Sequence, residues 1–109
     1  MITSDTIRGY NDLFILAILA EKDSYGYEIA KEIQDRTGGR YSMKETTLYS
    51  AVARLESNGH VVSYYGDETF GKRRTYYRIT GAGRTHFLGK CTEWELVKDV
   101  VDRFIKREV

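Results

Sequence analysis

Residues 42–59 carry the pattern that most restricts the fold of this chain. Apolar residues recur there at helical spacing, at Leu48, Ala51, Val52 and Leu55. This periodicity predicts a helix that buries one stripe. Ser42 and Glu45 have the spacing of a capping box, which would open the helix. Gly59 follows the last apolar residue and is expected to end it, because glycine readily adopts the left-handed conformation.

The opposite side of this helix carries only small side chains, namely Thr46, Ser50, Ala53 and Ser57. An ordinary solvated face is the alternative interpretation, but long charged residues are more usual on such a face. Small side chains let a helix backbone approach another surface closely, and the major groove of DNA is wide enough to receive it.

Two runs rich in β-branched and aromatic residues follow, at residues 60–65 and 74–79. Their composition predicts an antiparallel hairpin. The connection, residues 66–73, is longer than a tight turn and contains Gly71 followed by Lys72 and Arg73. We therefore expect a flexible basic loop at the tip of the hairpin.

Two further helices are predicted before residue 42. The first spans residues 5–21, where the apolar run of residues 13–20 implies contacts on more than one side. The second is capped by Ser24 and ends at the glycine pair 38–39. The chain is therefore expected to be mainly α with a small β-hairpin (α+β).

Three helices followed by a hairpin with a basic tip form a winged helix-turn-helix, predicted over residues 1–79. In this fold the third helix enters the major groove and the wing lies along the DNA backbone. The net charge of +1 is uninformative, but residues 36–84 hold nine basic and four acidic side chains. An uneven scatter could produce the same count, yet the concentration of positive charge favours nucleic acid as the partner.

Residues 80–109 are predicted to form a C-terminal dimerisation helix capped by Thr80. Four residues have a coiled-coil-like spacing of three, four and three, namely Trp94, Val97, Val101 and Phe104. Val100 and Ile105 broaden this seam beyond what one helix could bury against so small a body. A homodimer is the expected consequence, with the first helix also at the interface.

Three segments resemble the PadR family of transcriptional regulators. TLYSAVARLESNG at residues 47–59 is similar to the family's recognition-helix signature, and SYYGDETFGKRRTYYRITGAGR at residues 63–84 is similar to its wing. YGYEI at residues 25–29 fits as well. The resemblance covers nearly the whole chain, and it implies a DNA-binding transcription regulator that acts as a repressor.

The single C-terminal helix resembles the smaller PadR subfamily, similar to the multidrug-sensing regulator LmrR. In that subfamily the last helix packs near the first helix of the partner subunit, and paired tryptophans flank an apolar pore. The resemblance thus implies a planar aromatic ligand held by Trp94, Leu13, Leu16 and Val97. The alternative is that Trp94 only packs the dimer seam.

Contacts with double-stranded DNA are expected from the third helix and the wing. The predicted set comprises Thr46, Thr47, Tyr49 and Ser50 on the helix face, Lys44 and Arg54 at its edges, and Lys72, Arg73 and Arg74 at the wing tip. Tyr49 could instead lie partly in the core. Tyr76 and Tyr77 alternate along their strand, so one of them is expected to pack inward.

Several function classes are not expected. His60, His86 and Cys91 lack any familiar zinc spacing, and no nucleophile, base and orienting group occur together, so neither a metal site, a cofactor nor catalysis is predicted. The apolar run is too short to cross a membrane. A lone cysteine and the lack of a secretion signal indicate the cytoplasm. A protein-docking module built on the same fold remains the alternative function.

Overall fold

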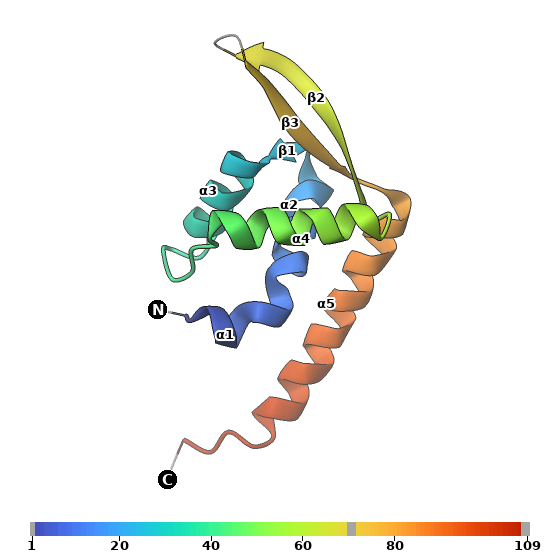
Figure 1. The fold of residues 1–109 in the computed structure, drawn as a ribbon. Coiled ribbons are helices and arrows are strands. Elements are labelled where there is room, and N and C mark those ends of the chain that lie inside the picture. The colour runs from blue at the N-terminus through green and yellow to red at the C-terminus, as the bar shows by residue number, and fades with distance from the viewer. Residues whose placement is uncertain (1, 70–71, 108–109) are drawn as a thin grey trace.

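A computed structural model describes residues 2–69 and 72–107, with backbone only for residues 67–69 and 72. Four long helices and a small sheet, which includes a projecting hairpin, make up most of the described chain (Figure 1). The elements are α1 (Ser4–Ile7), the 3₁₀ helix η1 (Arg8–Tyr10), α2 (Asn11–Glu21), β1 (Ser24–Tyr25), α3 (Gly26–Arg36), α4 (Glu45–Ser57), β2 (Val61–Thr69), β3 (Lys72–Ile79) and α5 (Gly81–Asp102). The mainly α architecture with a small β unit is confirmed.

The core lies where α2, α3 and α4 meet the base of the hairpin. Its most deeply buried side chains come from every one of these elements, and they are Ile15, Leu16, Leu19, Ile29, Leu48, Leu55 and Val61. The stripe predicted for α4 is confirmed, because all four of its residues are buried. Residues on the opposite side of α4 are exposed, so the helix has the two distinct faces that the sequence predicts.

The single N-terminal helix predicted over residues 5–21 is wrong. The segment forms three pieces, because the 3₁₀ turn of η1 interrupts it between α1 and α2. Gly9, a poor helix former, lies within that turn. Asn11 then begins α2 as a buried side chain, and its Oδ1 accepts a hydrogen bond of 2.7 Å from the Tyr41 hydroxyl.

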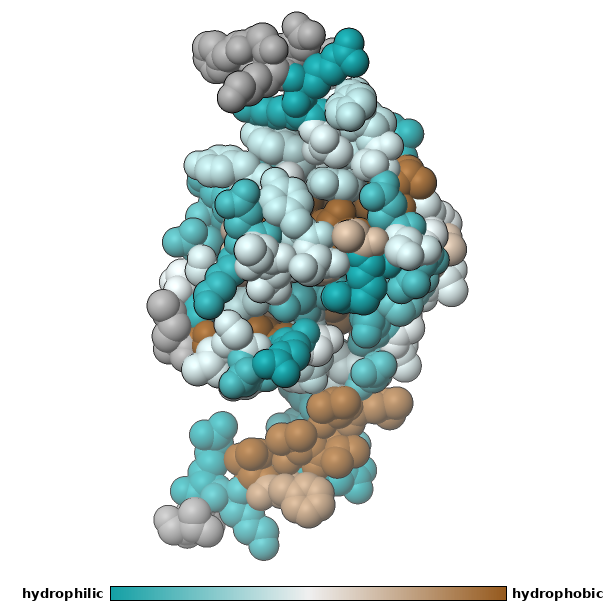
Figure 2. All heavy atoms as spheres, in the orientation of Figure 1, coloured by the Kyte–Doolittle hydropathy of each residue, from teal (hydrophilic) through white to brown (hydrophobic). Residues whose placement is uncertain are grey.

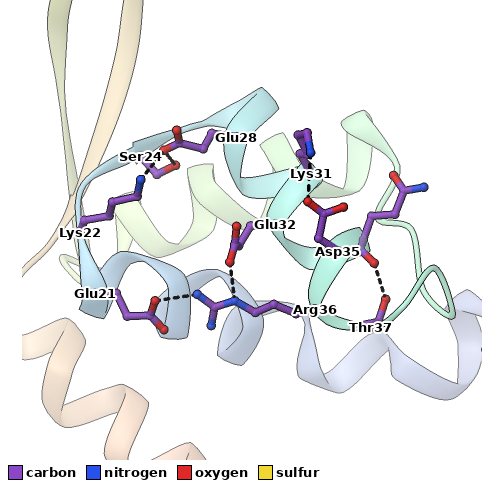
Figure 3. Close-up of polar contacts among 10 residues, drawn as sticks. Glu21, Lys22, Ser24, Glu28, Lys31, Glu32, Asp35, Arg36 and Thr37 are labelled. Carbon is purple, nitrogen blue, oxygen red and sulfur yellow. Dashed lines mark hydrogen bonds and ion pairs between the residues drawn. The ribbon is translucent and has the colours of Figure 1, made fainter.

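Ser24 does not cap the second helix as predicted, because it belongs to the short strand β1. Its hydroxyl donates a 2.6 Å hydrogen bond to Glu28, one turn into α3, while Lys22 approaches the same carboxylate (Figure 3). Further along α3, Arg36 binds both Glu21 of α2 and Glu32 of its own helix. These contacts fix α3 against the C-terminal end of α2.

The predicted capping box at Ser42 is also wrong. Lys44 is the N-cap of α4 and has no side-chain capping hydrogen bond. Residues 41–44 are held instead by burial, since Tyr41 and Met43 both lie in the core. The other end of α4 is as predicted, because Gly59 has a φ of 79° just after the C-cap Asn58.

The sheet has three antiparallel strands in the order β1-β3-β2, of which the sequence predicted only two. The hairpin strands are longer than expected, with a register irregularity between Tyr65 and Glu68. The ring of Tyr76 covers the backbone of Gly66, where a Cβ would collide with it. The hairpin therefore projects as a long twisted ribbon, and residues 70–71 of its tip lie outside the described residues (Figure 1).

Helix α5 begins as predicted, because the Thr80 hydroxyl accepts a 2.9 Å hydrogen bond from the Gly83 amide. It ends at Asp102, earlier than expected. The same hydroxyl donates to the Gly59 carbonyl, and Gly83 lies so close to the carbonyl of His60 that a Cβ there would collide with it. The start of α5 is thus fixed directly against the end of α4.

No helix among the described residues is long and apolar enough to span a membrane.

Candidate nucleic-acid interface

The outer face of α4 is the smooth, polar surface that the sequence predicts. Thr46 and Ser50 are exposed and Thr47 is half-buried, whereas Lys44 is exposed just before the helix. Tyr49 occupies one edge of this face and Arg54 the other. Both edge residues contact other parts of the chain, so the helix is held on two sides.

On the first edge, Tyr49 lies across the start of α3. A Cβ on Gly26 would be 2.5 Å from the Tyr49 hydroxyl oxygen, so the ring approaches α3 only because residue 26 has no side chain. The Tyr49 side chain is nevertheless 46% exposed. Beyond it lies an open hollow of about 340 Å³ between α4 and the wing. Besides Tyr49, its lining consists of Tyr25, Gly26, Tyr27, Arg74, Thr75 and Tyr77.

On the second edge, Arg54 donates a 2.6 Å hydrogen bond to Asp12 of α2 and forms an ion pair with it. The Asp12 side chain is only 17% exposed, whereas that of Arg54 is 54% exposed. The sequence analysis predicts that Arg54 contacts the DNA backbone, but it does not predict the ion pair with Asp12. The guanidinium is therefore oriented by α2 and still reachable from outside.

The wing presents its cations next to the α4 edge that bears Tyr49. Arg74 stacks over the ring of Tyr25 at 4.4 Å from its centroid, and Arg73 lies 5.9 Å from the Tyr65 ring centroid. Both are exposed. The side chain of Lys72, which the sequence grouped with them, lies outside the described residues.

The two tyrosines of β3 alternate as predicted. Tyr77 is buried at 8% exposure, and burial raises the pKa of its hydroxyl. Tyr76 points to the other face, where it makes an edge contact with Tyr25 and stacks on Tyr64. Three tyrosines thus form a row across the three strands, on the face of the sheet away from the core.

Arg78 lies at the Tyr64 end of this row and forms an ion pair with Asp23. Its guanidinium donates to Asp23 at 3.0 Å and lies 5.0 Å from the ring centroid of Tyr64, whose hydroxyl also donates to Asp23. The hydrogen bond from Tyr64, followed by that from Arg78, lowers the pKa of the Asp23 carboxyl. Arg78 therefore has an acidic partner, whereas Arg74, four residues earlier, has none among the described side chains.

A second, larger hollow of about 700 Å³ lies between α5 and the N-terminal segment. Its lining is mainly apolar and includes Leu13, Phe14, Trp94, Val97 and Val101. Three of the four predicted ligand residues are brought together here. The fourth, Leu16, is fully buried in the core and does not line this hollow.

Two further groups shape this apolar hollow. Tyr10 packs edge-on against Trp94 with ring centroids 5.4 Å apart. Lys98 also lines it, and its ammonium lies 3.6 Å from Asp102, which neutralises much of its charge.

The largest group of hydrophobic residues on the face shown in Figure 2 lies over the C-terminal half of α5. Gly83 is the only buried residue in the whole helix. The exposed large apolar side chains near its end are Leu96, Val97, Val100, Val101, Phe104 and Ile105. Of the predicted dimer seam, Trp94, Val97 and Val101 line the apolar hollow, whereas Phe104 lies beyond the end of α5 at 78% exposure.

The two histidines, which are far apart in the sequence, are in contact. The rings of His60 and His86 stack with centroids 4.1 Å apart, and Nδ1 of His60 is buried without a hydrogen-bond partner. Burial, and then His60 and Lys90, lower the pKa of His86, while Asp12 and Glu93 oppose this. Among the described residues no three potential metal ligands gather.

Sequence reasoning missed Asp12, Tyr25 and Tyr27 as parts of this surface. The signal for the tyrosines was the sequence Tyr-Gly-Tyr at residues 25–27, where a glycine opens a helix between two aromatics. Only a residue without a side chain lets Tyr49 reach this position. Asp12 gave no local signal, because its partner Arg54 is 42 residues away.

Comparisons with known proteins agree with the geometry. The family model described as "Transcriptional regulator PadR-like family" matches residues 15–88. A solved transcriptional regulator from Clostridium thermocellum is 58% identical, with a TM-score of 0.90 over 97% of this chain and 100% of that chain. An uncharacterized protein X of Lysinibacillus sphaericus is 44% identical over 106 residues, which are 97% of each chain.

The fold also occurs in a solved protein–DNA complex. Bacillus subtilis PadR, in complex with operator DNA, is similar over 73% of this chain and 46% of that chain, with 19% identity and a TM-score of 0.66. At this identity the likeness concerns the fold alone.

Proposed function

Because this chain belongs to the PadR-like family, whose members are transcriptional regulators and not enzymes, we propose that it is a sequence-specific DNA-binding repressor acting as a homodimer. In this proposal the outer face of α4 enters the major groove and the wing follows the backbone. Operator DNA is the partner of the Bacillus subtilis relative with the same fold. The lone Cys91, which has no disulfide partner, fits a protein that works in the cytoplasm.

One observation carries the proposal. Tyr49, at one edge of the small-residue face of α4, and Arg74 of β3 line a common hollow. A duplex that receives α4 in its major groove would therefore have a phosphate chain beside Arg73 and Arg74. In this arrangement Thr46, Thr47 and Ser50 face base edges, while Lys44 and Arg54 contact backbone at the two edges of the helix.

The exposed apolar residues at the end of α5 and just beyond it support the proposed homodimer. A single chain leaves Leu96, Val100 and Phe104 in water, and a second copy would cover them. We assign residues 1–79 to DNA binding and residues 80–109 to dimerisation. Two recognition helices related by a two-fold axis then bind half-sites about 34–36 Å apart.

The apolar hollow at Trp94 supports a ligand role that resembles that of LmrR. We propose that a planar aromatic molecule stacks on Trp94 between the two subunits, where Leu13 and Val97 supply further apolar contact. A ligand that favours one arrangement of the subunits would change the distance between the recognition helices and hence operator affinity.

Salt-dependent binding tests the DNA proposal. Duplexes of roughly 30 base pairs, long enough for two half-sites, are selected from a random library, and affinity is measured by fluorescence anisotropy over a salt series. We expect a steep negative dependence on salt. Ser50→Glu, which places a negative charge on the outer face of α4, abolishes binding, whereas Gln34→Glu on the exposed side of α3 does not. A protein that selects no duplex, yet binds an acidic protein surface, would instead be a docking module.

Repression and ligand sensing have separate tests. Adding the protein to an in vitro transcription reaction with a selected operator in the promoter should lower transcript yield, and a rise in yield contradicts repression.

For the ligand, 1-pyrenemethanol at saturation should quench Trp94 fluorescence and change operator affinity. Quenching without any change in affinity refutes the switch but leaves DNA binding intact.

A further inference from the structure

The hollow beside Tyr49 has a lining that suits an anion. Four tyrosines, one threonine and one arginine surround about 340 Å³ of open space at the junction of α3, α4 and β3. Tyrosine and threonine hydroxyls can each donate one hydrogen bond, and the guanidinium can donate several in a planar fork. Among the side chains that the structure describes, no acidic one lines this hollow.

Arg74 is the charged member of the lining, and the contact that the structure describes for its guanidinium is an aromatic ring. Among the described side chains no carboxylate lies within ion-pair distance of it, although Arg54, Arg78 and Arg36 each have an acidic partner. The Tyr25 ring supports its guanidinium from one side, at 4.4 Å. A cation fixed by an aromatic face retains its full charge and its donors for an incoming anion.

Three hydroxyls complete the arrangement, those of Tyr27, Tyr49 and Thr75. The Tyr49 hydroxyl is positioned in the lining by its close approach to Gly26. Tyr27 stands at the rim with 72% exposure, and Thr75 follows Arg74 on β3. The donors therefore come from three different elements and point to a common space.

We propose that this hollow binds one phosphodiester group of the DNA backbone, with Arg74 as the charged contact and the Tyr27 and Tyr49 hydroxyls as donors. The inference rests on the proposed function and adds a specific contact to it. The hollow lies between the recognition face and the wing, so a phosphate seated there fixes how deeply α4 enters the groove. The base of the wing, and not only its tip, then anchors the duplex.

A methylphosphonate scan tests the contact directly. In a selected duplex one phosphate at a time is replaced by neutral methylphosphonate, and affinity is measured for the wild type and for Arg74→Gln. The wild type is expected to lose about tenfold in affinity at one phosphate of each half-site, the size of one hydrogen-bonded charge contact. Arg74→Gln binds the unmodified duplex about tenfold more weakly, and the same replacement costs it nothing further.

Two more variants isolate the site. Tyr27→Phe removes one exposed hydroxyl without disturbing the fold, and it should show the same loss of sensitivity at that phosphate, to a smaller extent. Arg78→Gln is the matched control, since it removes a cation four residues further along the same strand that is already bound to Asp23. Its response to the scan should equal that of the wild type.

The outcomes separate this inference from the proposed function. If no selected duplex is bound, the proposed function fails. If duplexes are bound but Arg74→Gln and Tyr27→Phe retain full sensitivity at every phosphate, only the phosphate contact is overturned. Titration with inorganic phosphate, followed by NMR of the tyrosine rings, covers the other source of this ligand: micromolar binding without coupling to DNA would make the hollow a site for a free phosphate compound and contradict the proposal.

Discussion

The winged helix body and the C-terminal half of α5 both contain many apolar residues, but they bury them very differently. In the body, Leu48, Leu55 and Val61 are almost completely enclosed by α2, α3, α4 and the sheet. In α5, Leu96 and Val100 are more than half exposed, as is Phe104 just beyond its end. Helical periodicity therefore predicts which side of a helix is apolar. Whether that side is buried within one subunit depends on the rest of the chain.

The two sides of α5 sharpen this contrast. Trp94, Val97 and Val101 turn toward the N-terminal segment and line the apolar hollow. Leu96 and Val100 lie on another side of the helix, where no other part of the described chain buries them. The body thus buries its apolar residues within one chain, whereas the outer side of α5 leaves them exposed, as the proposed homodimer requires.

The largest expected effect comes from a cavity in the body. Leu55→Ala should lower the free energy of unfolding by about 2–5 kcal/mol, because a fully buried leucine leaves a void behind. Urea unfolding followed by circular dichroism measures this loss. Leu96→Ala, the matched change on α5, should leave the unfolding of dilute monomer almost unaffected. Equal losses in the two variants would remove the distinction between the regions.

A charge on the outer side of α5 should act on assembly and not on the fold. Val100→Asp is expected to weaken the dimer roughly a hundredfold, since two copies together lose about 3 kcal/mol of apolar burial. Sedimentation equilibrium measures the dissociation constant. Circular dichroism at high dilution serves as the control and should show the helix content of wild-type monomer. An unchanged dimer would mean that another surface joins the subunits.

The contact between Trp94 and Tyr10 is expected to contribute less. Trp94→Ala should cost about 1 kcal/mol from the lost aromatic pair, whereas Trp94→Phe should retain most of it. Thermal unfolding of the three proteins at matched concentration gives the values. If alanine and phenylalanine have the same effect, the ring pair does not hold α5 against the N-terminal segment.

The smallest effect is a pH dependence at the joint between the two regions. Because burial and the neighbouring His60 lower the pKa of His86 from its ordinary value of 6.5, the unfolded chain binds more protons than the folded one below that pH. Stability from this group is therefore fully present above about pH 6.5 and is lost as the pH falls further. Unfolding free energies measured across this range should decline less in His86→Phe. An equal decline in both proteins would place the titration elsewhere.

Local patterns predicted much of the fold because they act within one element. The α4 stripe, the Gly59 stop and the Thr80 cap each depend on residues a few positions apart, and all three are present. The capping box at Ser42 was local too, but burial of Met43 determined the backbone there instead.

What the sequence could not provide depends on distant partners. Strand β1 exists because residues 24–25 pair with Tyr76 and Tyr77 on β3, and two residues carry no strand signal of their own. The ion pair of Arg54 with Asp12 and the hollow between Tyr49 and Arg74 likewise join separate elements. The candidate DNA residues could be named from their side chains, but the orientation of each depends on such contacts.

The joint at Gly83 has a mechanical consequence. Since residue 83 rests on the His60 carbonyl at the end of α4, this contact is the pivot about which α5 would tilt, and its 22 residues would act as a lever about 33 Å long. A tilt of about 10° at this pivot would carry the far end through about 6 Å, a displacement that follows from the length of the helix alone. If two subunits are joined at the far ends of α5, as proposed, small rotations at Gly83 would change the distance between their α4 helices, and a Cβ at residue 83 would collide with the His60 carbonyl at this pivot.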